Sequence, residues 1–134
     1  MTARRPPTLI LASLANLLIG AVATIAGLGL LVPYARVLFT WFLPGRFDEL
    51  SLTTWAMGIA AYGALEVAGA LGTWRRSYRG WILALVIDLV SVAISCWSWA
   101  TTLPFDRGLP IGVAIWGMPL ALLLAPTTRD ALRR

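Results

Sequence analysis

Two acidic residues interrupt long apolar stretches of this sequence, Glu66 in one and Asp88 in the next. A charge at the centre of a membrane-spanning helix costs roughly 2.5 to 3.5 kcal/mol on insertion scales, so an acid there needs a partner, water or a proton. Glu66 lies eight residues before Trp74, and Asp88 lies eight residues after Gly80. At 1.5 Å per residue, both acids are roughly 12 Å from the turn between the stretches. We expect the two carboxyls at one level of an antiparallel helical hairpin.

Polar residues at helical spacing extend this acid pair. Tyr62 precedes Glu66 by one turn and is placed to donate a hydrogen bond to it. Ser91 and Ser95 follow Asp88 on its own face and form a polar stripe. One hypothesis is that the carboxyls bind or relay a cation or protons, with these hydroxyls beside them. The other is that each acid is protonated or hydrogen-bonded to a hydroxyl and only holds helices together.

The residue types that usually carry enzyme chemistry are missing from the sequence. There is no His, and a single cysteine, Cys96, has no partner within the chain for a disulfide. No Gly-rich phosphate loop, Ser–His pairing, HExxH or CxxC motif occurs. We therefore predict no metal site and no cofactor. An enzyme would have to act with Glu66, Asp88 and the arginines alone, for example on a lipid.

The elements that position the two acids are predicted to be membrane-spanning helices. With 59% apolar and 13% charged residues, the chain is too apolar to keep a solvated surface around one core. The apolar residues fall into four blocks, each long enough to cross roughly 30 Å of hydrocarbon as a helix. We predict an all-α, single membrane domain over residues 1–134, with spans at about 8–32, 52–74, 81–101 and 109–125.

The arginines predict the orientation of these spans. All eleven basic residues are arginine, and eight of them fall on one side if four spans alternate: Arg4, Arg5, Arg75, Arg76, Arg79, Arg129, Arg133 and Arg134. The positive-inside rule then places both termini and the hairpin turn in the cytoplasm of a cell membrane protein. We expect Arg75, Arg76 and Arg79 to contact anionic lipid headgroups. The net charge of +5 does not indicate nucleic acid, because the arginines lie between spans.

Two shorter features complete the predicted architecture. Residues 34–43 are rich in aromatic side chains, carry Arg36 and are too short to span, so an extracytoplasmic interfacial helix is expected there. The fourth block contains Pro119, which predicts a kinked helix.

Small residues recur on one face of the second block. Ala60, Ala64, Ala68 and Gly72 fall every four residues, roughly opposite Glu66. Such a stripe lets two helices approach closely. We expect it to pack against the glycine-rich first block, or against another subunit.

The run from Glu66 to Leu85 combines small residues, a Trp, an Arg-rich turn and a second Trp. It resembles the hairpins of many small bacterial four-span proteins, which implies a bacterial inner membrane. The membrane imposes this pattern on any short hairpin, so no family function follows from it. Our first hypothesis is an oligomeric channel or transporter-type protein in which Glu66 and Asp88 bind a cation or protons. The alternative is an accessory or scaffold subunit that docks a larger membrane partner.

Overall fold

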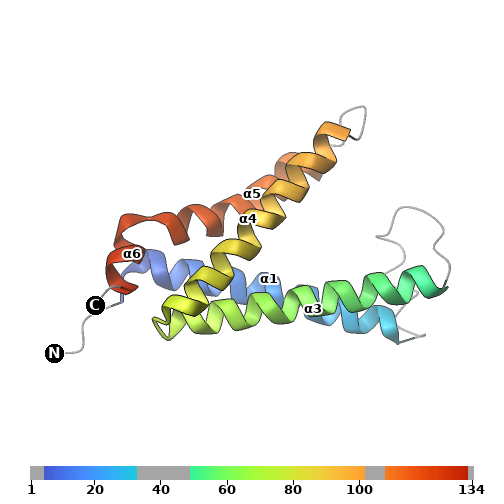
Figure 1. The fold of residues 1–134 in the computed structure, drawn as a ribbon, viewed down its shortest axis with the longest axis horizontal. Coiled ribbons are helices and arrows are strands. Elements are labelled where there is room, and N and C mark those ends of the chain that lie inside the picture. The colour runs from blue at the N-terminus through green and yellow to red at the C-terminus, as the bar shows by residue number, and fades with distance from the viewer. Residues whose placement is uncertain (1–4, 33–48, 102–107, 133–134) are drawn as a thin grey trace.

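The computed structural model describes residues 5–32, 49–101 and 108–132, and the regular structure within these ranges is entirely α-helical (Figure 1). In chain order the helices are α1 (Pro7–Leu31), α3 (Glu49–Trp74), α4 (Tyr78–Thr101), α5 (Gly108–Leu124) and α6 (Pro126–Leu132). The all-α prediction is confirmed for this part of the chain. The interfacial helix expected at residues 34–43 lies outside the described residues.

Three of these helices are long and apolar enough to cross a membrane, over Pro7–Leu31, Leu50–Trp74 and Tyr78–Trp97. Val113–Leu124 of α5 is a shorter apolar helix. Large apolar side chains point outward along them; Leu18, for example, is 68% exposed and Ile94 is 63% exposed. A surface of this kind is stable against lipid rather than against water. A membrane location therefore follows from the length, the composition and the outward faces of the helices.

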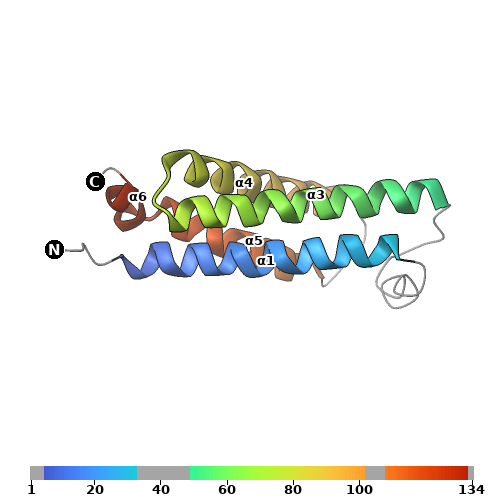
Figure 2. The ribbon, with the colours of Figure 1, turned by 90° about the horizontal axis from the view of Figure 1, so that it is seen from below.

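Glycine determines how closely α1 and α3 pack, and the two helices lie side by side in Figure 2. Gly20 and Gly27 of α1 face Gly63 and Ala60 of α3. A Cβ added at Gly20 would come within 2.8 Å of the Gly63 carbonyl oxygen, so a larger residue would push the backbones apart. In lipid, this close approach supplies the van der Waals contact that holds helices together.

The seam between α1 and α3 uses a different face of α3 from the expected one. Of the four predicted packing residues, Ala60 and Gly72 meet neighbouring helices, whereas Ala64 and Ala68 are exposed. Gly20 lies against the Cβ of Glu66, so the seam includes the acidic face of α3 rather than the face opposite. The face of Glu66 is covered because a buried acid cannot be left against lipid.

The turn between α3 and α4 is a Schellman motif. Arg76 adopts the left-handed conformation with φ of 59°, its amide donates to the carbonyl of Thr73 at 2.9 Å, and the amide of Ser77 donates to the carbonyl of Gly72 at 2.8 Å. This pattern satisfies carbonyls at the end of α3 and reverses the chain within a few residues. Gly72 also meets Gly80 at the start of α4, which closes the base of the hairpin.

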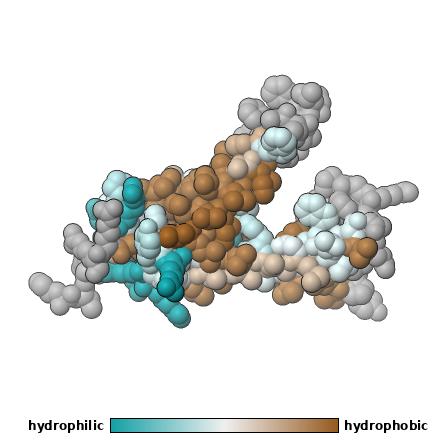
Figure 3. Space-filling view, viewed as in Figure 1, coloured by the Kyte–Doolittle hydropathy of each residue, from teal (hydrophilic) through white to brown (hydrophobic). Residues whose placement is uncertain are grey.

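The helices form two pairs that meet at one end of the molecule and separate toward the other (Figure 1). α1 lies with α3, and α4 lies with α5. At the end where the pairs meet, α6 folds back on the start of α1, where Thr128 donates to Thr8 at 2.9 Å. The indole of Trp81 donates to the carbonyl of Leu123 at 3.0 Å and ties α4 to α5. This end is hydrophilic on its surface, and the face seen over α4 and α5 is hydrophobic (Figure 3).

Candidate cation-binding site

Glu66 of α3 and Asp88 of α4 are both 0% exposed and belong to one polar cluster inside the protein. Their carboxyl groups lie close enough for their charges to interact. A hydrogen bond between these two carboxyls requires a proton on one of them, because an ionised carboxylate only accepts hydrogen bonds. The structure thus brings together the two acids that the hairpin spacing placed at one level.

Tyr62 connects the acid pair to a serine of α4. Its hydroxyl donates to Glu66 Oε1 at 2.9 Å and lies 3.1 Å from Ser91 Oγ. Ser91 Oγ is also 2.8 Å from the carbonyl oxygen of Ile87, to which it can donate. Ser95 lies one turn further along α4, and its hydroxyl donates to the Ser91 carbonyl at 2.8 Å. Ser95 therefore adjoins the cluster without contacting either carboxyl through these bonds.

Because each hydroxyl carries one hydrogen, this row of oxygens has two consistent arrangements. With the proton between the two carboxyls, Tyr62 donates to Glu66 and accepts a hydrogen bond from Ser91. With the proton between Glu66 and Tyr62, both hydroxyls donate in the opposite direction. Tyr62 then donates to Ser91, and Ser91 donates to the carbonyl of Ile87. The same contacts accommodate the proton on either side of Glu66.

Asn16 of α1 is a third buried polar residue in the cluster, and the helical spacing of the hairpin does not predict it. It is 0% exposed, and its Nδ2 donates to Asp88 Oδ2 at 3.1 Å. Asn16 is the one asparagine of the chain, which has no glutamine, and it lies nine residues after Pro7 in an otherwise apolar stretch. That depth is close to the level estimated for the two acids. Its amide and its depth were the signals that could have identified it.

Three oxygens of the cluster are buried without a hydrogen-bond donor from the protein: Asn16 Oδ1, Glu66 Oε2 and Asp88 Oδ1. The other oxygen of each carboxyl accepts from Tyr62 or from Asn16. Glu66 Oε2 and Asp88 Oδ1 are therefore the atoms between which a shared proton fits. Buried polar atoms without a partner are costly and rare in native proteins. The cluster offers oxygen atoms, which are the ligands of hard cations as well as of protons.

The basic residues of the described chain lie away from this cluster. They are at the start of α1, in the α3–α4 turn, at the start of α4 and in α6: Arg5, Arg75, Arg76, Arg79 and Arg129. Arg5 stacks over the ring of Trp74, 4.4 Å from its centroid, and Arg75 and Arg79 are exposed at the same end. The interactions found for Glu66 and Asp88 include no arginine. In the described part of the chain, two acids are thus buried together without a basic partner.

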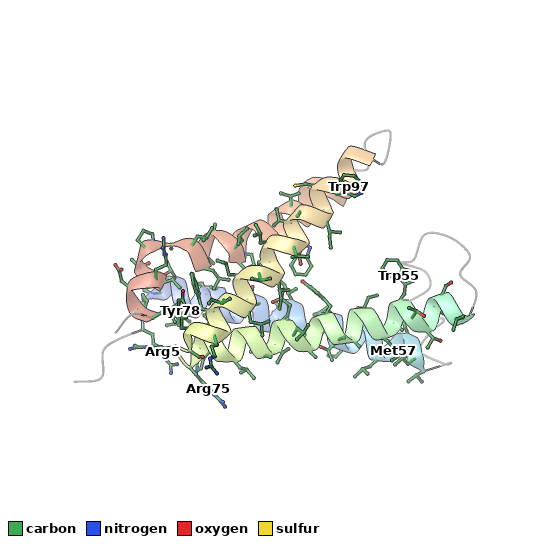
Figure 4. All side chains as sticks on the ribbon, viewed as in Figure 1. Arg5, Trp55, Met57, Arg75, Tyr78 and Trp97 are labelled. Atoms are coloured by element: carbon green, nitrogen blue, oxygen red, sulfur yellow. The ribbon has the colours of Figure 1, made fainter. Side chains whose placement is uncertain are left out.

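An open cavity of about 350 Å³ lies beside Tyr62. Its described walls are all on α3, and Trp55 among them is 60% exposed; they are Thr54, Trp55, Gly58, Ile59 and Tyr62. Trp55 points from α3 into the space between the two helix pairs (Figure 4). On α5, Trp116 meets the ring of Tyr62 edge-on, with centroids 5.7 Å apart and planes at 87°. Tyr62 therefore separates an apolar, aromatic cavity from the buried acids.

Among the described residues, no three His, Cys, Asp or Glu side chains come together to hold a metal ion. The chain matches no protein-family model, no curated protein and no solved structure. Its function has to be inferred from the buried acid pair and its surroundings.

Proposed function

We propose that this chain is a four-span membrane protein of the channel or transporter type, in which Glu66 and Asp88 bind a proton or another monovalent cation. Three helices have the length and composition for spanning. α5 has 17 residues, so it extends over roughly 25 Å at 1.5 Å per residue. A modest local thinning of the bilayer allows a helix of this length to cross as the fourth span.

The arrangement of arginines supports an orientation with both ends of the chain in the cytoplasm. The start of α1, the α3–α4 turn and α6 lie at one end of the molecule (Figure 1). Arg5, Arg75, Arg79 and Arg129 belong to these segments. Clustered arginine next to spans marks the cytoplasmic side and attracts anionic lipid.

The burial of Glu66 and Asp88 in one polar cluster is the observation that carries the proposed function. Leaving one buried carboxylate uncompensated costs several kcal/mol, and two adjacent carboxylates repel each other as well. A shared proton removes one of the two charges. Hydrogen bonds from Tyr62 and Asn16 stabilise the remaining negative charge, and a further proton or a monovalent cation neutralises that charge. The site therefore takes up and releases one positive charge at a time.

A purely structural role for the acids accounts for less of what is seen. Residues that only join helices have every hydrogen-bonding atom paired, because an unpaired atom weakens the contact. Here a proton shared by Glu66 Oε2 and Asp88 Oδ1 still leaves the buried Asn16 Oδ1 without a protein donor. This oxygen is explained if it faces a further proton or a cation during function.

The transport proposal is tested by flux in proteoliposomes. Glu66→Gln and Asp88→Asn keep side-chain size and remove one negative charge each. Asp130→Asn removes an exposed carboxyl from α6 and is the matched control. We expect a gradient-driven proton or alkali-cation flux that falls at least about tenfold in both cluster variants, corresponding to the loss of one strong interaction. Undiminished flux in both cluster variants would refute the proposal.

A second candidate is an accessory subunit of a larger membrane complex. It is favoured by Ala64 and Ala68, which are exposed on α3 and would let a partner helix approach closely. This function predicts co-purification of a larger membrane protein in mild detergent. Isolation of a homo-oligomer that alone supports ion flux would contradict it.

A further inference from the structure

The cavity beside Tyr62 has the size and lining of a small-molecule site. Its volume of about 350 Å³ is at the lower end of the roughly 300–1,000 Å³ typical of ligand pockets. Trp55 and Tyr62 contribute aromatic rings, Ile59 contributes an apolar wall, and Thr54 contributes one hydroxyl. None of the described lining residues is charged. A bound ligand must therefore be largely apolar.

The negative charge next to this cavity lies behind Tyr62. The hydroxyl of that residue donates to Glu66, so its ring stands between the cavity and the acid pair. Electron-rich aromatic faces attract cations, most strongly where water is excluded. A cation against Tyr62 or Trp55 would also be drawn to the buried carboxylate, because the low-dielectric interior screens that charge weakly.

We propose that this cavity binds a monovalent organic cation with an apolar, aromatic or alkyl body. The inference rests on the proposed function, because the negative charge that attracts the cation from behind Tyr62 is that of the acid pair. Charge complementarity selects this ligand class, because the two buried carboxyls lie behind Tyr62, which lines an uncharged aromatic pocket. A lipid acyl chain would fit the pocket equally well but would gain nothing from the acids.

A pair of probes that differ only in charge separates these two occupants. Trimethylphenylammonium is a monovalent cation, and tert-butylbenzene is its neutral isostere. Binding of the cation to the full-length protein in detergent is measured by equilibrium dialysis, with the neutral compound as competitor. We expect saturable binding of the cation that the neutral isostere at equal free concentration does not displace.

Two glycines allow the cavity to be blocked with a matched control. A Cβ added at Gly58, which lines the cavity, or at Gly117 of α5, which does not line it, meets no atom within 4 Å. Gly58→Leu and Gly117→Leu both raise helix propensity, so neither is expected to unfold the protein. We expect Gly58→Leu to weaken cation binding at least about tenfold and Gly117→Leu to leave it within about twofold. Helical circular dichroism confirms folding in each case.

The outcomes separate this inference from the proposed function. Any of three results would overturn the inference: tert-butylbenzene displaces the cation at equal free concentration, Gly58→Leu binds the cation as tightly as the wild type, or the cation shows no saturable binding. If any of these occurs while proton or alkali-cation flux still depends on Glu66, the proposed function stands and the organic-cation site is wrong. If flux does not depend on Glu66 or Asp88 either, both fail.

Discussion

Replacing Asn16 with alanine is expected to destabilise the protein, because it removes the donor of a buried hydrogen bond. Asn16 Nδ2 lies 3.1 Å from Asp88 Oδ2, and both residues are 0% exposed, so water cannot replace the lost bond. A hydrogen bond to a charged group contributes about 1.5–3 kcal/mol net, whereas polar contacts between membrane helices average ~0.6 kcal/mol. We therefore expect Asn16→Ala to lower the free energy of unfolding by about 1.5–3 kcal/mol if Asp88 is charged, and by less if it is neutral.

A double-mutant cycle measures this difference. Unfolding in mixed micelles of a mild detergent and dodecyl sulfate is followed by circular dichroism for wild type, Asn16→Ala, Asp88→Asn and the double variant. Asp88→Asn keeps an acceptor oxygen but no charge, so Asn16→Ala is expected to cost only ~0.6 kcal/mol in that background. Leu18→Ala is the control, since Leu18 is 68% exposed on the same helix. If Asn16→Ala lowers the free energy of unfolding by the same amount in both backgrounds, Asp88 does not carry a charge that Asn16 stabilises.

Three further results are expected. Tyr62→Phe removes the hydroxyl but keeps the ring, so proteoliposome flux should fall while binding of the organic cation in dialysis is retained; loss of binding with unchanged flux would contradict the assigned role. Gly27→Leu forces a side chain into the α3 backbone and should destabilise the fold by about 1–3 kcal/mol in the same unfolding assay, whereas Gly58→Leu should not. In a Cys96→Ser background, Ser77→Cys should react with an impermeant thiol reagent only from the cytoplasmic face of oriented vesicles; labelling from the opposite face would overturn the proposed topology.

Much of the helical framework follows from physical constraints visible in the sequence. Hydrocarbon requires long apolar helices, and the arginine-rich turn leaves too few residues for anything but a hairpin. Equal spacing of Glu66 and Asp88 from that turn is enough to predict their shared level, because the rise per residue of a helix is fixed. Helical periodicity similarly places Tyr62 one turn from Glu66, where its hydroxyl donates.

The residues that sequence reasoning missed depend on which faces of the helices meet. Asn16 belongs to a helix far away in the chain, and its contact with Asp88 exists only because α1 packs against the hairpin. The regular stripe of small residues on α3 suggested a seam opposite Glu66. Instead, α1 covers the acidic face through Gly20 and Gly63, since shielding a carboxyl from lipid outweighs the packing of a few methyl groups.

Trp116 illustrates the same limit. It lies in the middle of the fourth apolar block, and helical spacing within that block does not indicate its partner. In the structure its ring packs edge-on against Tyr62 from another helix pair. Periodicity gives the face of one helix, but it does not give the angle at which two pairs diverge.

Infrared spectroscopy of the purified protein at neutral pH, without added organic cation, tests most directly whether the buried acids share a proton. A protonated carboxyl gives a carbonyl stretching band that is distinct from the bands of ionised carboxylates. We predict such a band in the wild type and in Asp130→Asn, and its loss or shift in Glu66→Gln and in Asp88→Asn. A wild-type spectrum with no protonated carboxyl, or a band unchanged by both cluster substitutions, would show that the two acids do not hold a proton between them.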